Sequence, residues 1–134
     1  MLLSNKKTTI IEFFGNDVNL EITAPPETTT IGTRTFMNKN LKTIKFQRNP
    51  LNRLGEAGFS QFTIQTISIP DSLINLGVSC FENCQFLTSI SFSYSCPLTV
   101  IPENCFKNCK NLQILKFPSS LTTIKVKHSS IAMA

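Results

Sequence analysis

The feature that most constrains this chain is an internal repeat of about 23 residues. A phenylalanine marks the same place in four successive units, at Phe36, Phe59, Phe81 and Phe106. A chain that repeats a unit of this length stacks the copies into a solenoid, in which each copy buries its apolar edge against its neighbours. The four phenylalanines are therefore predicted to form a column in the core.

Each unit also contains a short strand pattern. In residues 41–46, 64–69, 87–92 and 112–117, the last apolar positions alternate with polar ones, which is the period of a strand with one buried face. A turn with a proline follows each of these segments, at Pro50, Pro70, Pro97 and Pro118. Because proline has no N–H to donate, it belongs where the hydrogen bonds of a sheet stop. Stacked units of this kind predict a parallel β-sheet.

The rest of the unit contains an apolar pair and a glycine. The pair is spaced i and i+3, as in Leu73 and Leu76, and a glycine follows it at Gly32, Gly55 and Gly77. These glycines predict a tight bend with a positive φ angle. The section around the phenylalanine is too short for a stable helix, so we predict a single helical or 3₁₀ turn there.

The pattern divides the chain into three parts. Residues 1–17 are predicted to flank or cap the repeats, 18–126 to form a repeat domain of four to five units, and 127–134 to form a tail. The unit boundaries are 18–40, 41–63, 64–86, 87–111 and a partial unit at 112–126. After Ile124, the next phenylalanine slot holds Ser129. The solenoid is therefore predicted to stop without a cap, which would leave an edge for weak end-to-end self-association.

The units resemble the BspA-like, or treponemal-type, leucine-rich repeat. The closest matches to its pattern of strand, proline, Ser-Leu pair, glycine and Cys-Phe-x-x-Cys are residues 67–84 and 105–112. The resemblance implies a right-handed solenoid with a parallel β-sheet on its concave face. On the convex side it implies short turns or 3₁₀ or helical turns, with little regular helix. It also implies a binding role, because similar proteins on mucosal bacteria and protozoan parasites are associated with adhesion.

Alternation within the strands places a set of mostly polar side chains on the outer face of this sheet. The predicted partner-binding residues are Thr43, Lys45, Thr66, Ser68, Ser89, Ser91, Ile114 and Lys116. Ile114 is apolar among hydroxyls and is a candidate anchor contact. The alternative interpretation is a solvated, hydroxyl-rich face that binds nothing.

The cysteines allow three interpretations. Two Cys-x₃-Cys pairs, Cys80 with Cys84 and Cys105 with Cys109, have spacings that a zinc site tolerates. A disulfide between Cys84 and Cys109 is also conceivable, because rungs of a parallel sheet are about 4.8 Å apart. We expect free thiols that pack as small hydrophobic groups, with Cys84 and Cys109 in the repeat core beside the phenylalanines. Equivalent slots contain Thr35, Lys39, Gly58 and Phe62, so they select shape and not a thiolate.

The chain offers little for catalysis. Its one histidine, His128, lies in the tail, so no histidine-based triad can be assembled around a core serine. The 8 acidic residues are spread over different units, and stacking predicts a surface ion pair between Glu82 and Lys107. We predict that the chain is not an enzyme and has no cofactor and no metal, with a zinc-structured domain as the least favoured reading.

Charge and composition narrow the partners further. The 13 lysines and arginines are dispersed and the chain has one tyrosine and no tryptophan, so we predict no nucleic-acid partner. No segment approaches the ~20 apolar residues that span a bilayer, so we predict no membrane insertion. The predicted function is a non-catalytic protein-binding module. Family resemblance favours a cell-surface adhesin, whereas the lack of a signal peptide and of N-x-S/T sites favours an intracellular scaffold or regulator.

Overall fold

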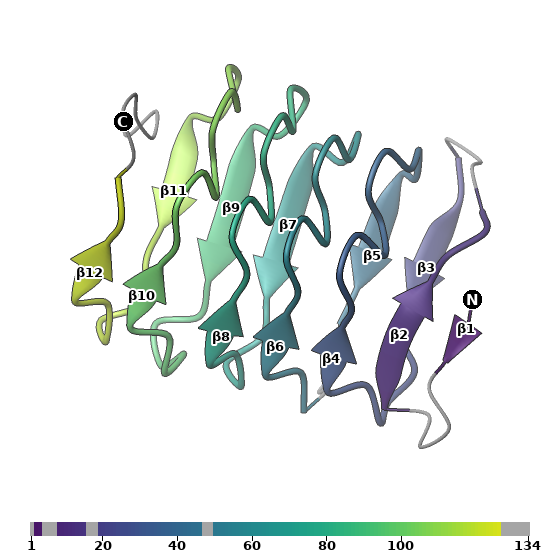
Figure 1. The fold of residues 1–134 in the computed structure, drawn as a ribbon, viewed down its shortest axis with the longest axis horizontal. Coiled ribbons are helices and arrows are strands. Elements are labelled where there is room, and N and C mark those ends of the chain that lie inside the picture. The colour runs from purple at the N-terminus through teal and green to yellow at the C-terminus, as the bar shows by residue number, and fades with distance from the viewer. Residues whose placement is uncertain (1, 4–7, 16–18, 47–49, 127–134) are drawn as a thin grey trace.

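The chain is wound into a solenoid whose turns each contribute strands to two rows (Figure 1). The computed structural model describes residues 2–3, 8–15, 19–46 and 50–126, with residues 2–3 described in their backbone alone. The described ranges contain β-strands and turns and no helix. The predicted parallel-strand solenoid is therefore confirmed.

The first row of strands, which we call the back row, lies farther from the viewer in Figure 1. It contains the four predicted strands, β5 (Thr43–Lys45), β7 (Thr66–Ile69), β9 (Ser89–Phe92) and β11 (Ile114–Lys116), and an additional strand before them, β3 (Glu21–Thr23). The recorded pairs are parallel and join β3 to β5, β7 to β9 and β9 to β11. Every second side chain of these strands points into the core, for example Ile67 and Ile90, both of which are buried.

The second row, which we call the front row, lies nearer the viewer. Its members are β2 (Thr9–Glu12), β4 (Thr30–Ile31), β6 (Arg53–Leu54), β8 (Asn75–Leu76), β10 (Val100–Ile101) and β12 (Thr123–Ile124). The sequence did not predict this row, since a strand of two residues is too short to show alternation. The apolar residues spaced i and i+3 are its inward-facing positions, and Leu51 and Leu54 are both fully buried.

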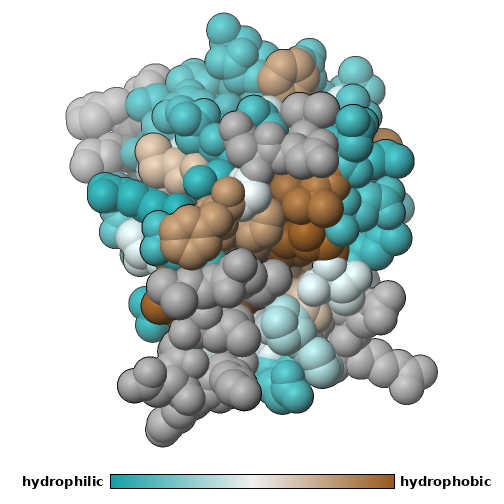
Figure 2. All heavy atoms as spheres, turned by 90° about the vertical axis from the view of Figure 1, so that its right-hand side faces the viewer, coloured by the Kyte–Doolittle hydropathy of each residue, from teal (hydrophilic) through white to brown (hydrophobic). Residues whose placement is uncertain are grey.

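At the N-terminal end, an antiparallel strand lies beside the first parallel one. Strand β1 (Leu2–Leu3) pairs antiparallel with β2, and β2 pairs in parallel with β4. Figure 2 looks onto this end and shows hydrophobic side chains at its centre with hydrophilic ones around much of the rim. The segment predicted to flank the repeats thus contributes β2 to the front row.

The phenylalanine column lies in the core as predicted. Phe36, Phe59, Phe81 and Phe106 are fully buried. Successive ring centroids lie 5.3, 5.5 and 5.7 Å apart, and the ring planes are within 8° of parallel. Phe13 extends the column toward the N-terminus, with its centroid 5.3 Å from that of Phe36. One aromatic side chain per turn therefore fixes the spacing of the turns.

The segments around these phenylalanines are turns and not helical or 3₁₀ segments. Two residues per turn have positive φ angles, namely Arg34 and Asn38, Ala57 and Gln61, Ser79 and Asn83, and Asn104 and Asn108. Left-handed residues interrupt the run of right-handed angles that a helix needs. Backbone bonds lie within each segment, as from Phe62 N to Phe59 O at 3.2 Å, and also join neighbouring turns, as from Phe59 N to Cys80 O at 2.9 Å.

The prediction of a positive φ at the repeated glycine position is wrong, since no described glycine has a positive φ. The glycines are needed because stacked backbones approach each other closely. A Cβ added at Gly77 would lie 2.4 Å from Glu56 N and from Gly55 C, and one at Gly55 would lie 2.7 Å from Gly32 C. Space, and not backbone angle, selects glycine at Gly55 and Gly77.

Each row of strands has one interruption among the described residues. In the front row, no ladder joins β8 to β10. The amides of Gly32, Gly55 and Gly77 each donate to the preceding turn at 2.8 Å, but the equivalent residue after β10 is Pro102, which has no N–H. In the back row, no ladder joins β5 to β7, and hollows lined by residues of both strands lie along that junction.

Candidate binding surface on the back row

The predicted partner-binding residues lie on the outer surface of the back row, which we call the back face. Six of them form two columns in register: Thr66, Ser89 and Ile114 in the first, and Ser68, Ser91 and Lys116 in the second. Thr43 and Lys45 occupy the same strand positions in β5 but pair with Glu21 and Thr23 of β3. All eight side chains are exposed or half-buried. The structure thus presents hydroxyl groups along the back face, with Ile114 as an apolar member that is 49% exposed.

A charged cluster at the β3–β5 end completes the back face. The Glu21 carboxylate lies 3.3 Å from Lys42 Nζ and 3.7 Å from Lys45 Nζ. The hydrogen bond from Lys42 and the charges of Lys42 and Lys45 lower the pKa of Glu21, so it is ionised at neutral pH. Sequence reasoning did not select Glu21 or Lys42. Glu21 lies in the first unit, residues 18–40, and an alignment of that unit with the second, which places Glu21 opposite Thr43, would have found it.

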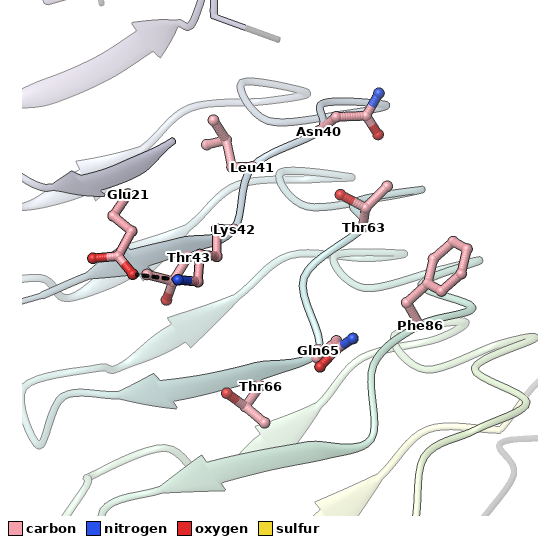
Figure 3. A pocket seen from close by; sticks show the side chains of 9 residues that line it. All are labelled: Glu21, Asn40, Leu41, Lys42, Thr43, Thr63, Gln65, Thr66 and Phe86. Atoms are coloured by element: carbon pink, nitrogen blue, oxygen red, sulfur yellow. Dashed lines mark ion pairs between the residues drawn. The ribbon is translucent and has the colours of Figure 1, made fainter. Parts of the chain in front are cut away.

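A shallow hollow lies on the back face at the junction of β5 and β7 (Figure 3). Its volume is about 560 Å³, and its lining consists of Glu21, Asn40, Leu41, Lys42, Thr43, Thr63, Gln65, Thr66 and Phe86. Figure 3 shows the Glu21–Lys42 ion pair on one side of this hollow and the Phe86 ring on the other. A smaller hollow of about 350 Å³ follows the same junction farther along the strands, between Thr43–Phe46 and Thr66–Ser68.

The comparisons with known proteins identify the family. The model of the BspA type leucine rich repeat region matches residues 9–128 and finds 6 copies of the repeat. The chain belongs to the BspA-type leucine-rich-repeat family. The family match covers the front and back rows alike, and it begins within the segment predicted to flank the repeats. A search of curated protein sequences found no match.

Solved structures show the same fold for this BspA-type chain. A leucine-rich repeat protein from Eubacterium ventriosum matches with a TM-score of 0.73 and 20% identity, over 93% of this chain and 38% of that one. The pneumococcal vaccine antigen PcpA matches with a TM-score of 0.66 and 23% identity, over 90% of this chain and 36% of that one. The chain therefore spans little more than a third of the length of these proteins.

The cysteines of the BspA-type units are buried free thiols in the structure. The thiols of Cys84 and Cys109 donate to carbonyl oxygens of the preceding turn, Phe59 O and Phe81 O, each at 3.0 Å. Burial raises the pKa of the Cys80 thiol to about 12. In the slot of Cys84, the second unit has Phe62, which is 1% exposed and lies 5.5 Å from the Phe59 ring. The slot therefore accepts a group that fills space, whether or not it contains sulfur.

The surface ion pair between Glu82 and Lys107 is confirmed, with 3.9 Å between the carboxylate and Nζ. Within residues 2–3, 8–15, 19–46 and 50–126, no group of three or more His, Cys, Asp or Glu is placed to hold a metal ion. No helix in those ranges could cross a bilayer. His128 and Ser129 lie outside the described residues.

Proposed function

We propose that this chain is a non-catalytic module that binds a protein partner through the back face. The observation that carries the proposal is the pair of columns in register, which presents Ser and Thr hydroxyls across three strands with Ile114 at one end. Hydroxyls on a rigid sheet supply hydrogen bonds at fixed spacings, and an exposed apolar side chain supplies contact area that loses water on binding. The family supports this reading, because repeat solenoids of this kind present extended binding surfaces.

The charges of the back face indicate how a partner would be oriented. Lys45 already contacts Glu21, whereas no ion pair is recorded for Lys116 within the described part of the chain. Lys116 is exposed at the end of the second column, beside Ser91. It is therefore available to an acidic group of the partner, which would raise the association rate and set the orientation of the complex.

Adhesion or surface recognition is the biological use we propose. Two facts support it: the family match, and the structural likeness to PcpA, which is described as a pneumococcal vaccine antigen. At 23% identity this likeness concerns the fold, so the family match is the stronger of the two supports.

The test is capture of partners from solubilised host-cell surfaces and from cytosolic extract, with the wild-type chain and the double variant K45E/K116E as bait. We expect the variant to fold, with its free energy of unfolding within about 0.5 kcal/mol of wild type, and to bind the captured protein roughly tenfold more weakly. The matched control is K110E/K125E, which reverses two exposed charges away from the back face. Equal affinities of the two folded double variants would place the interface elsewhere.

A further inference from the structure

An exposed aromatic ring, that of Phe86, lies beside the back face. Four residues separate Phe59 from Ile64, but five separate Phe81 from Leu87, and Phe86 belongs to that longer connection. Cys84 and Leu87 are both fully buried, whereas Phe86 is 58% exposed. The turn is held by backbone bonds from Gln85 N to Asn83 O and from Leu87 N to Cys84 O. The extra residue thus lifts an aromatic ring out of the core on a defined turn.

The ring of Phe86 lies between two hollows. The first is the 560 Å³ hollow on the back face described above, and the second has a volume of about 430 Å³. The second is lined by Asn38, Gln61, Phe62, Thr63, Asn83, Gln85 and Phe86. Both volumes fall in the range of about 300–1,000 Å³ that is usual for small-molecule sites. Because Phe86 and Thr63 line both hollows, a chain-like ligand could occupy the two by passing over the ring.

The lining of the two hollows is uncharged in sum, although the whole chain has a net charge of +5. The second hollow has no charged side chain in its lining, and in the first hollow Glu21 and Lys42 neutralise each other. The other polar groups are carboxamides and hydroxyls. Among the described residues, no side-chain hydrogen bond is recorded for Gln61, Gln65 or Gln85, so these amides are open to a ligand.

We propose that the surface around Phe86 binds an uncharged oligosaccharide. A carboxamide donates and accepts hydrogen bonds at once, which matches the sugar hydroxyl, itself both donor and acceptor. A pyranose ring has an apolar C–H face that can cover the Phe86 ring and remove it from water. An acidic or basic peptide would find no net charge to pair with, and an apolar peptide would bury the amides without partners.

This inference goes beyond the proposed function, because it concerns a sugar bound around Phe86 and not a protein bound along the strand columns. The two surfaces share Thr43 and Thr66, which line the first hollow. The two can fail separately. Lys45 and Lys116 do not line either hollow beside Phe86, and Phe86 is not in the columns. The K45E/K116E variant therefore reports on the protein site, and variants of Phe86 report on the sugar site.

The experiment is a titration of the ¹⁵N-labelled chain with cellohexaose, mannohexaose and chitohexaose, followed by amide NMR shifts. We expect at least one hexasaccharide to shift the amides of Phe86, Gln61 and Gln65 in a saturable manner. Phe86→Ala should then weaken binding of that sugar about tenfold or more, whereas Phe86→Tyr, which retains the ring, should stay within about threefold of wild type. Tyr94→Ala removes another exposed aromatic side chain, 77% exposed, and should leave binding unchanged.

Two results would overturn the proposal. One is the absence of saturable shifts near Phe86 with all three hexasaccharides. The other is sugar binding that Phe86→Ala leaves unchanged while the variant keeps the wild-type circular dichroism and melting temperature. If Phe86→Ala weakens binding of the captured protein partner and no hexasaccharide binds, the ring is a protein contact and the sugar proposal is wrong.

Discussion

In the core of the solenoid, one column contains phenylalanine at four successive turns, whereas an outer column of the back row changes from Thr66 to Ser89 to Ile114. Both columns repeat at the same rung spacing. The inner column cannot vary freely, because successive rings pack against one another with centroids 5.3–5.7 Å apart. The outer column has no such neighbours above the sheet. The interior therefore sets the position of each rung, and the exterior is free to differ from rung to rung and to recognise a ligand.

The largest effect should come from breaking the interior column. Phe81→Ala removes a fully buried ring between two others and should lower the free energy of unfolding by about 3–5 kcal/mol. Urea denaturation followed by circular dichroism measures this loss. The matched control is Phe86→Ala, five residues later and exposed, which should change stability by no more than about 0.5 kcal/mol. Similar losses in the two variants would mean that the distinction between inside and outside is wrong.

A smaller effect is expected where stacked backbones touch. Gly77→Ala places a methyl group 2.4 Å from Glu56 N and Gly55 C, so the turns must separate, at a cost of about 1–3 kcal/mol. Gly32→Ala is the control, because the nearest atoms to its added methyl lie 3.1 Å away and need to move less. Thermal and urea denaturation of both variants give the comparison. A Gly32→Ala loss equal to that of Gly77→Ala would contradict the packing argument.

One interior position that is apolar in other turns contains a threonine, Thr28, and an apolar substitution there should raise the free energy of unfolding. Thr28 occupies the slot that Leu51, Leu73 and Leu98 fill in other turns, and its hydroxyl is buried without a hydrogen-bond partner among the described residues. Thr28→Val removes that hydroxyl while keeping the shape, and should raise the free energy of unfolding by about 1 kcal/mol. Thr66→Val on the exposed back face is the control and should change stability less. A destabilised Thr28→Val variant would show that the hydroxyl finds a partner in solution.

The smallest effect concerns the outer surface. The folded-state pKa of Glu21 is lowered by Lys42 and Lys45, so the stabilisation from this cluster is present above the ordinary carboxyl pKa and is lost as pH falls through the folded-state value. Lys42→Ala should raise the pKa of Glu21 toward its ordinary range, which a carboxyl NMR titration measures. Because the cluster is exposed, the effect should shrink at high salt. An unchanged titration in Lys42→Ala would mean that the ion pair does not persist in solution.

The sequence was sufficient to predict the features that every unit must repeat. The phenylalanine column, the back-row strands and the Glu82–Lys107 pair all follow from one period and one alternation. The front row escaped prediction because its two-residue strands show no alternation. The glycine slot was noticed but explained wrongly, because a single unit does not reveal that Gly55 and Gly77 touch each other across turns.

The site was less predictable than the fold for the same reason. Alternation identified the outward residues of β5, β7, β9 and β11, because the direction of a side chain is a local property of each strand. The hollow at the β5–β7 junction depends on which ladder is interrupted, which no local pattern encodes. Phe86 was hidden because strand starts at 41, 64 and 87 are evenly spaced. Compared with the unit that begins at Leu41, the unit that begins at Ile64 has one residue fewer before its phenylalanine and one more after it, so the total length is unchanged.

The interruptions of the two rows do not lie at the same level of the solenoid. The front ladder stops between β8 and β10, and at that level the back row is continuous from β7 through β9 to β11. The back ladder stops between β5 and β7, and at that level the front row is continuous from β2 through β4 and β6 to β8. Each weak junction is therefore bridged by an intact ladder on the opposite side. Each junction is also crossed by backbone hydrogen bonds of the phenylalanine turns, from Phe59 N to Cys80 O and from Phe81 N to Cys105 O, both at 2.9 Å. An interruption in one row therefore leaves the neighbouring turns joined on two other sides, so the stack is continuous along its whole described length.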